Sequence, residues 1–146
     1  MFLGTFTPRL DDKGRFFLPA KHRDAFTTGL VLAPGQEHSV QLFTPEQYEL
    51  ESDALLADPV QDADARAYMR MWGALSSEEV PDKQGRVSIS AKLRDWARLD
   101  KDIAVVGAFK CLEIWDLETW DTYEGTHRES LATRGGRLQG RRGGGA

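Results

Sequence analysis

The stretch DDKGRFFLPAKHRDAF, residues 11–26, recurs 71 residues later as DKQGRVSISAKLRDWA, residues 82–97. Seven of the first fourteen positions are identical, and each copy carries an Asp, a Gly and an Arg in the same order. The Gly ends a short polar loop ahead of alternating apolar residues, where it can adopt a positive φ without steric cost. The pattern predicts a hairpin turn, a strand that begins at the Arg, and then a short helix.

The duplication extends beyond this turn. VQLFTPEQY at residues 40–48 parallels LEIWDLETW at residues 112–120, and short β-rich runs precede both blocks. Thr44 and Asp116 are good N-cap residues for a helix that follows each strand, and Ser90 can cap the short helix of the second repeat. Each repeat therefore predicts strand, turn, strand, short helix, strand, turn, strand and a longer helix. About 50 residues are marginal for an independent core, so we expect both repeats to share one core about a pseudo-twofold axis.

The chain divides into four regions on this basis. They are a first repeat over 1–55, a connecting turn and helix over 56–76, a second repeat over 77–127, and a disordered Arg/Gly-rich tail over 128–146.

The connecting region has a turn signal at residues 58–59 and then a helical apolar face made by Ala65, Tyr68, Met69 and Trp72. We expect this face to pack on the core or on a neighbouring subunit. The alternatives are a cofactor site or a partner-binding helix. Residues 134–146 hold six Gly and four Arg, a composition that predicts disorder. Such a tail is either a solvated end or a nonspecific nucleic-acid contact.

Composition limits the class of protein. The 146 residues are 40% hydrophobic and 29% charged, as in ordinary soluble proteins. No apolar run approaches the roughly 18 residues of a membrane helix, and no secretory signal begins the chain, so we expect a cytoplasmic protein without membrane contact. The net charge is −4, and five Arg against one Glu after residue 127 leave −8 on the remaining 127 residues. This balance does not by itself suggest a nucleic-acid binder.

The sequence offers little for catalysis. It has no HExxH, GxSxG or Walker motif, and His22, His38 and His127 have no counterparts in the other repeat. Cys111, the single cysteine, excludes an intrachain disulfide and a cysteine–metal cluster, and its alternating strand context predicts a small core residue. We expect no enzyme activity, cofactor, metal or small-molecule ligand.

The duplicated turn suits binding better. Asp11 and Asp82 stand four residues before Arg15 and Arg86, close enough across the turn to orient each guanidinium. A guanidinium held in this way suits the O6 and N7 atoms of guanine. Nearby cations could contact phosphates: Lys13, Lys83, Lys21, Lys92, Arg23 and Arg94. An exposed Asp–Arg pair that only stabilises its turn is the simpler alternative, but its occurrence in both copies favours recognition.

The D-x-x-G-R turn followed by P/S-A-K-x-R resembles the SpoVT/AbrB-type DNA-binding domain. Two tandem copies, together with MFLGTF at the start, DADARAYMR in the connecting region and LEIWD near residue 112, are similar over roughly residues 1–127 to the MraZ family of bacterial regulators. This resemblance implies a mainly β fold with helices (α+β), a double-split swapped-hairpin β-barrel of two intertwined repeats, and assembly into a homo-oligomeric ring.

The resemblance also implies a function. It implies binding of tandem G-rich boxes in double-stranded DNA upstream of the protein's own operon, regulation of the division and cell-wall gene cluster, and a place in the cytoplasm at the nucleoid. Its Asp–Arg signatures fall on Asp11–Arg15 and Asp82–Arg86.

Two departures from the family pattern concern the second repeat. Ser90 stands where the family commonly has Pro, and Val87-Ser88 replace the aromatic pair Phe16-Phe17 of the first repeat. We expect Arg15 to contribute more than Arg86. An AbrB-like interaction module, of antitoxin or scaffold type, is the main alternative function, and an enzyme is a distant third. The sequence does not decide whether the protein represses or activates transcription, how large the ring is, or which DNA boxes it binds. It also does not decide whether Arg15 and Arg86 contact bases or phosphates.

Overall fold

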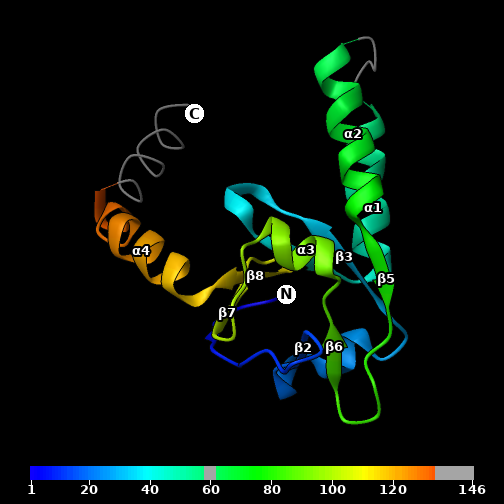
Figure 1. Ribbon diagram of the computed structural model, residues 1–146. Helices are drawn as coiled ribbons and strands as arrows, with labels where there is room; N and C mark the ends of the chain where they lie inside the picture. The colour runs from blue at the N-terminus through cyan, green and yellow to red at the C-terminus, as the bar shows by residue number, and fades with distance from the viewer. Residues whose placement is uncertain (58–61, 134–146) are drawn as a thin grey trace.

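The computed structural model describes residues 1–57 and 62–133, as helices on a mostly antiparallel sheet (Figure 1). In chain order the elements are β1 (Thr5–Phe6), β2 (Arg15–Phe17), the 3₁₀ helix η1 (Ala20–Phe26), β3 (Leu30–Pro34), the 3₁₀ turn η2 (Gln36–His38), β4 (Val40–Phe43), α1 (Pro45–Ala57), α2 (Ala63–Leu75), β5 (Ser77–Glu79), β6 (Arg86–Ser88), α3 (Ala91–Trp96), β7 (Ile103–Gly107), β8 (Leu112–Asp116) and α4 (Leu117–His127). The predicted α+β class is confirmed.

The strands form a six-stranded sheet in the order β1-β7-β8-β4-β3-β5 and a separate two-stranded ribbon of β2 and β6. The hairpins β3–β4 and β7–β8 lie at the centre of the large sheet and meet through β4 and β8. Within the described residues these sheets do not form one closed barrel, so the predicted barrel is not confirmed.

Each strand at an edge of the large sheet pairs with a strand of the other repeat. β1 pairs with β7, and β5 pairs with β3. The ribbon follows the same rule, because β2 pairs with β6 with Phe16 opposite Val87. The prediction that the strand after each turn forms a hairpin within its own repeat is therefore wrong: its partner lies in the other repeat.

This exchange gives the two repeats one core. Phe16, Leu18 and Phe26 from the first repeat pack in the same cluster as Val87 and Leu93 from the second. All five side chains are at most 1% exposed. Their burial drives the fold, since removal of apolar surface from water is the dominant favourable term in folding. Neither repeat can form the β2–β6 ribbon without the other.

The helices begin where the sequence predicts. Thr44 Oγ1 accepts a hydrogen bond from Gln47 N at 3.2 Å, and Asp116 Oδ2 accepts one from Thr119 N at 3.2 Å. Ser90 Oγ accepts one from Leu93 N at 3.3 Å at the start of α3. Such caps satisfy amide groups that the helix itself leaves unpaired. Ser90 therefore starts its helix by capping, where the first repeat uses Pro19.

α1 and α2 run side by side and project from one end of the sheet, while α4 projects from another side (Figure 1). Trp72 on α2 stacks on Tyr48 at 5.7 Å between ring centroids and meets Phe43 at 6.0 Å, so this side chain packs as predicted. Tyr68 does not join that contact face, because it is 49% exposed. No helix among the described residues is long and apolar enough to cross a membrane.

The predicted turn at 58–59 and residues 134–146 of the predicted tail lie outside the described residues. The first residues assigned to that tail, 128–133, are described as a turn and a short helical segment after α4.

Gly107 on β7 offers a test of the cross-repeat contact with the N-terminal arm. A Cβ at Gly107 would lie 2.5 Å from Leu3 N and Cα, whereas a Cβ at Gly73 in α2 would meet nothing within 4 Å. We expect Gly107→Ala to lower the free energy of unfolding by about 1–3 kcal/mol through overpacking. Gly73→Ala should raise it by roughly 0.5–1 kcal/mol, because Ala loses less backbone entropy in a helix. Urea unfolding of both variants measures the contrast, and equal behaviour would contradict the contact.

Candidate nucleic-acid interface

The first Asp–Arg turn is held by a single carboxylate. Asp11 Oδ1 accepts hydrogen bonds from the backbone N–H groups of Lys13 and Arg15, both at 2.9 Å. Asp11 Oδ2 accepts one from Arg15 Nε at 2.8 Å. Two backbone bonds close the turn, Gly14 N to Asp11 O at 3.0 Å and Asp11 N to Arg15 O at 2.8 Å. Gly14 has a φ of +75°, which explains the Gly at this position.

The second turn repeats this arrangement. Asp82 Oδ1 accepts from Gln84 N at 3.0 Å and Arg86 N at 2.9 Å, and Asp82 Oδ2 accepts from Arg86 Nε at 2.7 Å. Gly85 has a φ of +84°. Both guanidinium groups are thus fixed through Nε, and no other described residue hydrogen-bonds to their Nη atoms. Two NH₂ groups on each Arg are left to meet a ligand.

The β2–β6 ribbon brings the two turns together. Phe16 and Val87 point into the core, so the alternation along each strand puts Arg15 and Arg86 on the opposite, outer face. Their side chains are 26% and 24% exposed. Figure 1 shows this ribbon at the end of the molecule away from α1 and α2. The ribbon therefore presents two preorganised arginines on one surface.

Sequence analysis named Phe17 only as part of an aromatic pair and did not place it on the outer face, where it lies beside the two arginines. It is 50% exposed and stands opposite Arg86, whereas Ser88 stands opposite Arg15. The signal was present in the period-two alternation, since Phe17 is two residues from Arg15. The two halves of the surface therefore differ in chemistry.

The lysines predicted as phosphate contacts are all exposed. Lys13 and Lys83 lie within the two turns, and Lys21 and Lys92 lie in the first turns of η1 and α3. Lys21 Nζ also stands 5.3 Å from the ring centroid of Phe6, a cation–π contact.

Arg23 and Arg94 are more constrained than the sequence suggested. Arg23 Nε donates to Leu18 O, and Arg94 Nε donates to Ile89 O, each at 3.1 Å. Both carbonyl groups belong to the residue that follows the ribbon strand of the same repeat. These two arginines therefore bond to the backbone where the ribbon strands end, and their Nε atoms are already engaged.

The turns also shift the acidity of their carboxyl groups. The hydrogen bond from the Arg15 backbone N–H is the main cause that lowers the pKa of Asp11 below its usual 3.8. The Arg86 backbone N–H does the same for the pKa of Asp82. Both residues therefore stay ionised at neutral pH and keep their arginines oriented.

Other candidate groups do not form a catalytic site. Burial raises the pKa of the Cys111 thiol to about 12, with smaller contributions from Glu113 and Glu51, so the thiol stays protonated. This agrees with the predicted core role. Burial lowers the pKa of His22, which packs edge-on against Phe2 and Phe6. Among residues 1–57 and 62–133, no group of three or more His, Cys, Asp or Glu side chains could hold a metal ion.

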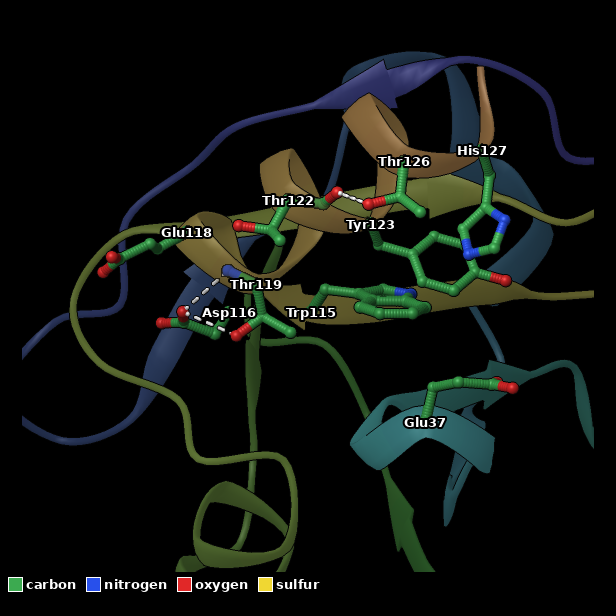
Figure 2. Close-up of a pocket in the computed structure, with 9 residues that line it drawn as sticks. All are labelled: Glu37, Trp115, Asp116, Glu118, Thr119, Thr122, Tyr123, Thr126 and His127. Carbon is green, nitrogen blue, oxygen red and sulfur yellow. Dashed lines mark hydrogen bonds between the residues drawn. The ribbon is translucent and has the colours of Figure 1, made fainter. Parts of the chain in front are cut away.

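An open groove between α4 and the η2 turn has the wrong charge for a phosphate ligand. Figure 2 shows Trp115 on its floor, Tyr123 and His127 above it, and the carboxylates of Glu37 and Glu118 at its edges. Acidic edges repel a nucleic-acid backbone. The ribbon face is the better candidate.

The lowered pKa values predict a pH dependence of stability. A carboxyl group with a lowered folded-state pKa stabilises the fold fully above its unfolded pKa, and this contribution is lost as the pH falls through the folded value. The free energy difference between wild type and the Asp11→Asn, Asp82→Asn variant should therefore be large at pH 6 and shrink between pH 4 and 2. Chemical denaturation across this range measures it. Asp12→Asn in the same turn is the control, and a difference that does not depend on pH would contradict the role of the carboxylates.

Sequence comparison finds relatives of this chain over both repeats. The sequence matches the family described as "MraZ protein, putative antitoxin-like" over residues 1–71 and 76–142. Several curated relatives carry the name "Transcriptional regulator MraZ". One from Salinispora arenicola is 48% identical over 90% of this chain and 93% of its own. One from Thermobifida fusca is 48% identical over 90% and 92%, and one from Micrococcus luteus is 48% identical over 84% and 86%.

These names describe regulators and not enzymes, in agreement with the prediction that the chain is not an enzyme. The match spans both repeats and includes the two Asp–Arg turns. On this similarity the chain belongs to the MraZ family.

Proposed function

We propose that this protein is a sequence-specific DNA-binding transcriptional regulator that contacts guanines through Arg15 and Arg86. The observation that carries the proposal is the pair of Asp-held arginines on one face of the ribbon. A two-stranded ribbon fits the major groove of B-DNA, where guanine presents the O6 and N7 acceptors that a guanidinium recognises. The names of the relatives agree with regulation of transcription.

Preorganisation explains why these arginines suit base contact. Each carboxylate occupies Nε and leaves the Nη atoms for a ligand, so less rotamer freedom is lost on binding. Lys13, Lys83, Lys21 and Lys92 are exposed around the ribbon and would bind phosphates. Arg23 and Arg94 would add phosphate contacts only through their Nη atoms, because Nε is already engaged.

We further propose that the target is a set of tandem G-rich boxes upstream of the protein's own operon in the division and cell-wall gene cluster. The protein would then act in the cytoplasm, at the nucleoid. Tandem boxes suit an assembly, since several weak contacts on one DNA molecule add through effective concentration. An assembly also lets a chain of net charge −4 bind DNA, because it gathers the Arg-bearing ribbons of many copies.

The assembly that we propose is a ring. A ring needs two different, complementary surfaces on each protomer. One candidate, the α2 face, is made by Tyr68 and Met71, which are 49% and 54% exposed and line an apolar groove of about 560 Å³. The other, the α4 face, is made by Trp120, Tyr123 and Leu131. The two faces lie on different projections of the molecule, as a head-to-tail contact requires (Figure 1).

The finer fold and domain assignments belong to this proposal. The exchanged edge strands and the β2–β6 ribbon support a swapped-hairpin barrel opened into two sheets. The repeats would span 1–55 and 77–127, joined by 56–76.

Substitution of the two arginines tests the DNA contact. On a duplex with one G-rich box, we expect Arg15→Ala and Arg86→Ala each to weaken binding by about 1–3 kcal/mol, with little effect on a scrambled duplex. Fluorescence anisotropy at several salt concentrations measures this. Lys13→Ala and Lys21→Ala should weaken binding to both duplexes and reduce the salt dependence.

Arg70→Ala is the control, because Arg70 is an exposed arginine on α2, at the end of the molecule away from the ribbon, and lines neither of the two proposed assembly faces. Equal losses on both duplexes would assign Arg15 and Arg86 to phosphates. Wild-type protein without any preference for the box would overturn the proposal and favour an AbrB-like interaction module of antitoxin or scaffold type.

The ring has its own test. We expect Met71→Asp to block the α2 face and Leu131→Asp to block the α4 face, so that each variant alone is monomeric by light scattering. A mixture of the two should form dimers and nothing larger, because only one productive contact remains between them. Lys101→Ser is the control and should assemble like wild type. Full assembly of either variant would exclude its surface from the interface.

A further inference from the structure

Each Asp–Arg turn rests on an arginine from the opposite repeat. A Cβ built on Gly14 would lie 2.7 Å from Nε and 2.8 Å from Cζ of Arg94. A Cβ on Gly85 would lie 2.9 Å from Nε and 3.2 Å from Cζ of Arg23. The guanidinium groups therefore lie directly against the two turn glycines, each across the boundary between repeats.

Backbone bonds complete this contact on both sides. Ile89 N donates to Gly14 O at 2.9 Å, and Ile89 O accepts from Arg94 Nε at 3.1 Å. Ile89 is thus hydrogen-bonded both to Gly14 of the first turn and to Arg94, the side chain that lies against Gly14. Leu18 makes the same two bonds at the second turn: Leu18 N donates to Gly85 O at 3.0 Å, and Leu18 O accepts from Arg23 Nε at 3.1 Å.

The φ values of +75° and +84° at the two glycines are strained for other residues. A Cβ at either position would also push the arginine side chain away from its place against the turn. A side chain that touches one wall of a turn and bonds to the strand beside it restricts how that turn can move. Gly14 is buried whereas Gly85 is only partly buried, so the first turn is the more enclosed of the two.

We propose that Arg94 and Arg23 are crossed positioning residues: Arg94 holds the turn that carries Arg15, and Arg23 holds the turn that carries Arg86. The effect on DNA recognition rests on the proposed function, whereas the effect on the turns does not. Lys separates this role from a simple phosphate contact, because it keeps the positive charge but lacks the planar guanidinium and the Nε–H donor.

Hydrogen exchange in the DNA-free protein tests the crossed support. We expect Arg94→Lys to speed exchange of the Gly14 and Arg15 amides roughly five- to tenfold, the effect of a lost hydrogen bond, and to leave the Gly85 and Arg86 amides nearly unchanged. Arg23→Lys should do the reverse. Arg98→Lys is the control, since Arg98 faces His38 at 3.5 Å. Acceleration in the same repeat, in both turns equally, or in neither would overturn the proposal.

Double-mutant cycles on the G-rich duplex test the consequence for recognition. In the wild-type background, Arg94→Lys should weaken binding roughly tenfold. In the Arg15→Ala background the same substitution should have little effect, whereas in the Arg86→Ala background its effect should persist. Arg23→Lys should couple to Arg86 in the same way. Equal coupling to both arginines, or none, would refute positioning. If wild type does not prefer the box, the proposed function fails, and the exchange result still decides the crossed support.

Discussion

The pairing of β2 with β6 is the contact on which the rest of the structure depends. Each strand contributes three residues, and an isolated two-stranded ribbon of this length is not stable in water. The ribbon forms because Phe16 and Val87 on its inner face enter the shared core. The same pairing fixes both Asp–Arg turns on one outer surface. Burial of one face thus preorganises the other.

Local chemistry made much of this predictable from the sequence. The positive-φ glycines, the Asp four residues before each Arg, and the caps at Thr44, Ser90 and Asp116 all depend on neighbours in the chain. The pairing of β2 with β6, in contrast, does not depend on neighbours in the chain. An apolar–polar alternation is the same whether a strand pairs within its repeat or with the other one, so sequence patterning alone favoured the shorter, wrong connection.

The candidate site also has one part that local sequence predicts and one part that it does not. The orientation of Arg15 by Asp11 follows from spacing, but the contact of Arg94 with Gly14 joins residues 80 positions apart and has no local signal. From the sequence alone, an Arg in a short helix that also carries a Lys is expected to contact phosphate, and nothing local shows that its guanidinium lies against a glycine of the other repeat. Phe17 shows a different limit, since its face was predictable but its exposure depends on what covers the ribbon.

The exchange of strands also has a consequence for synthesis. β1 pairs with β7, whose residues leave the ribosome roughly 100 positions later, on the order of 5–20 s at typical translation rates. During that interval the first repeat has its β3–β4 hairpin but lacks the partners of β1 and β2. Phe16 and Leu18 then have no second repeat to cover them. A nascent chain of this protein therefore exposes these apolar side chains to water until the second repeat has been synthesised.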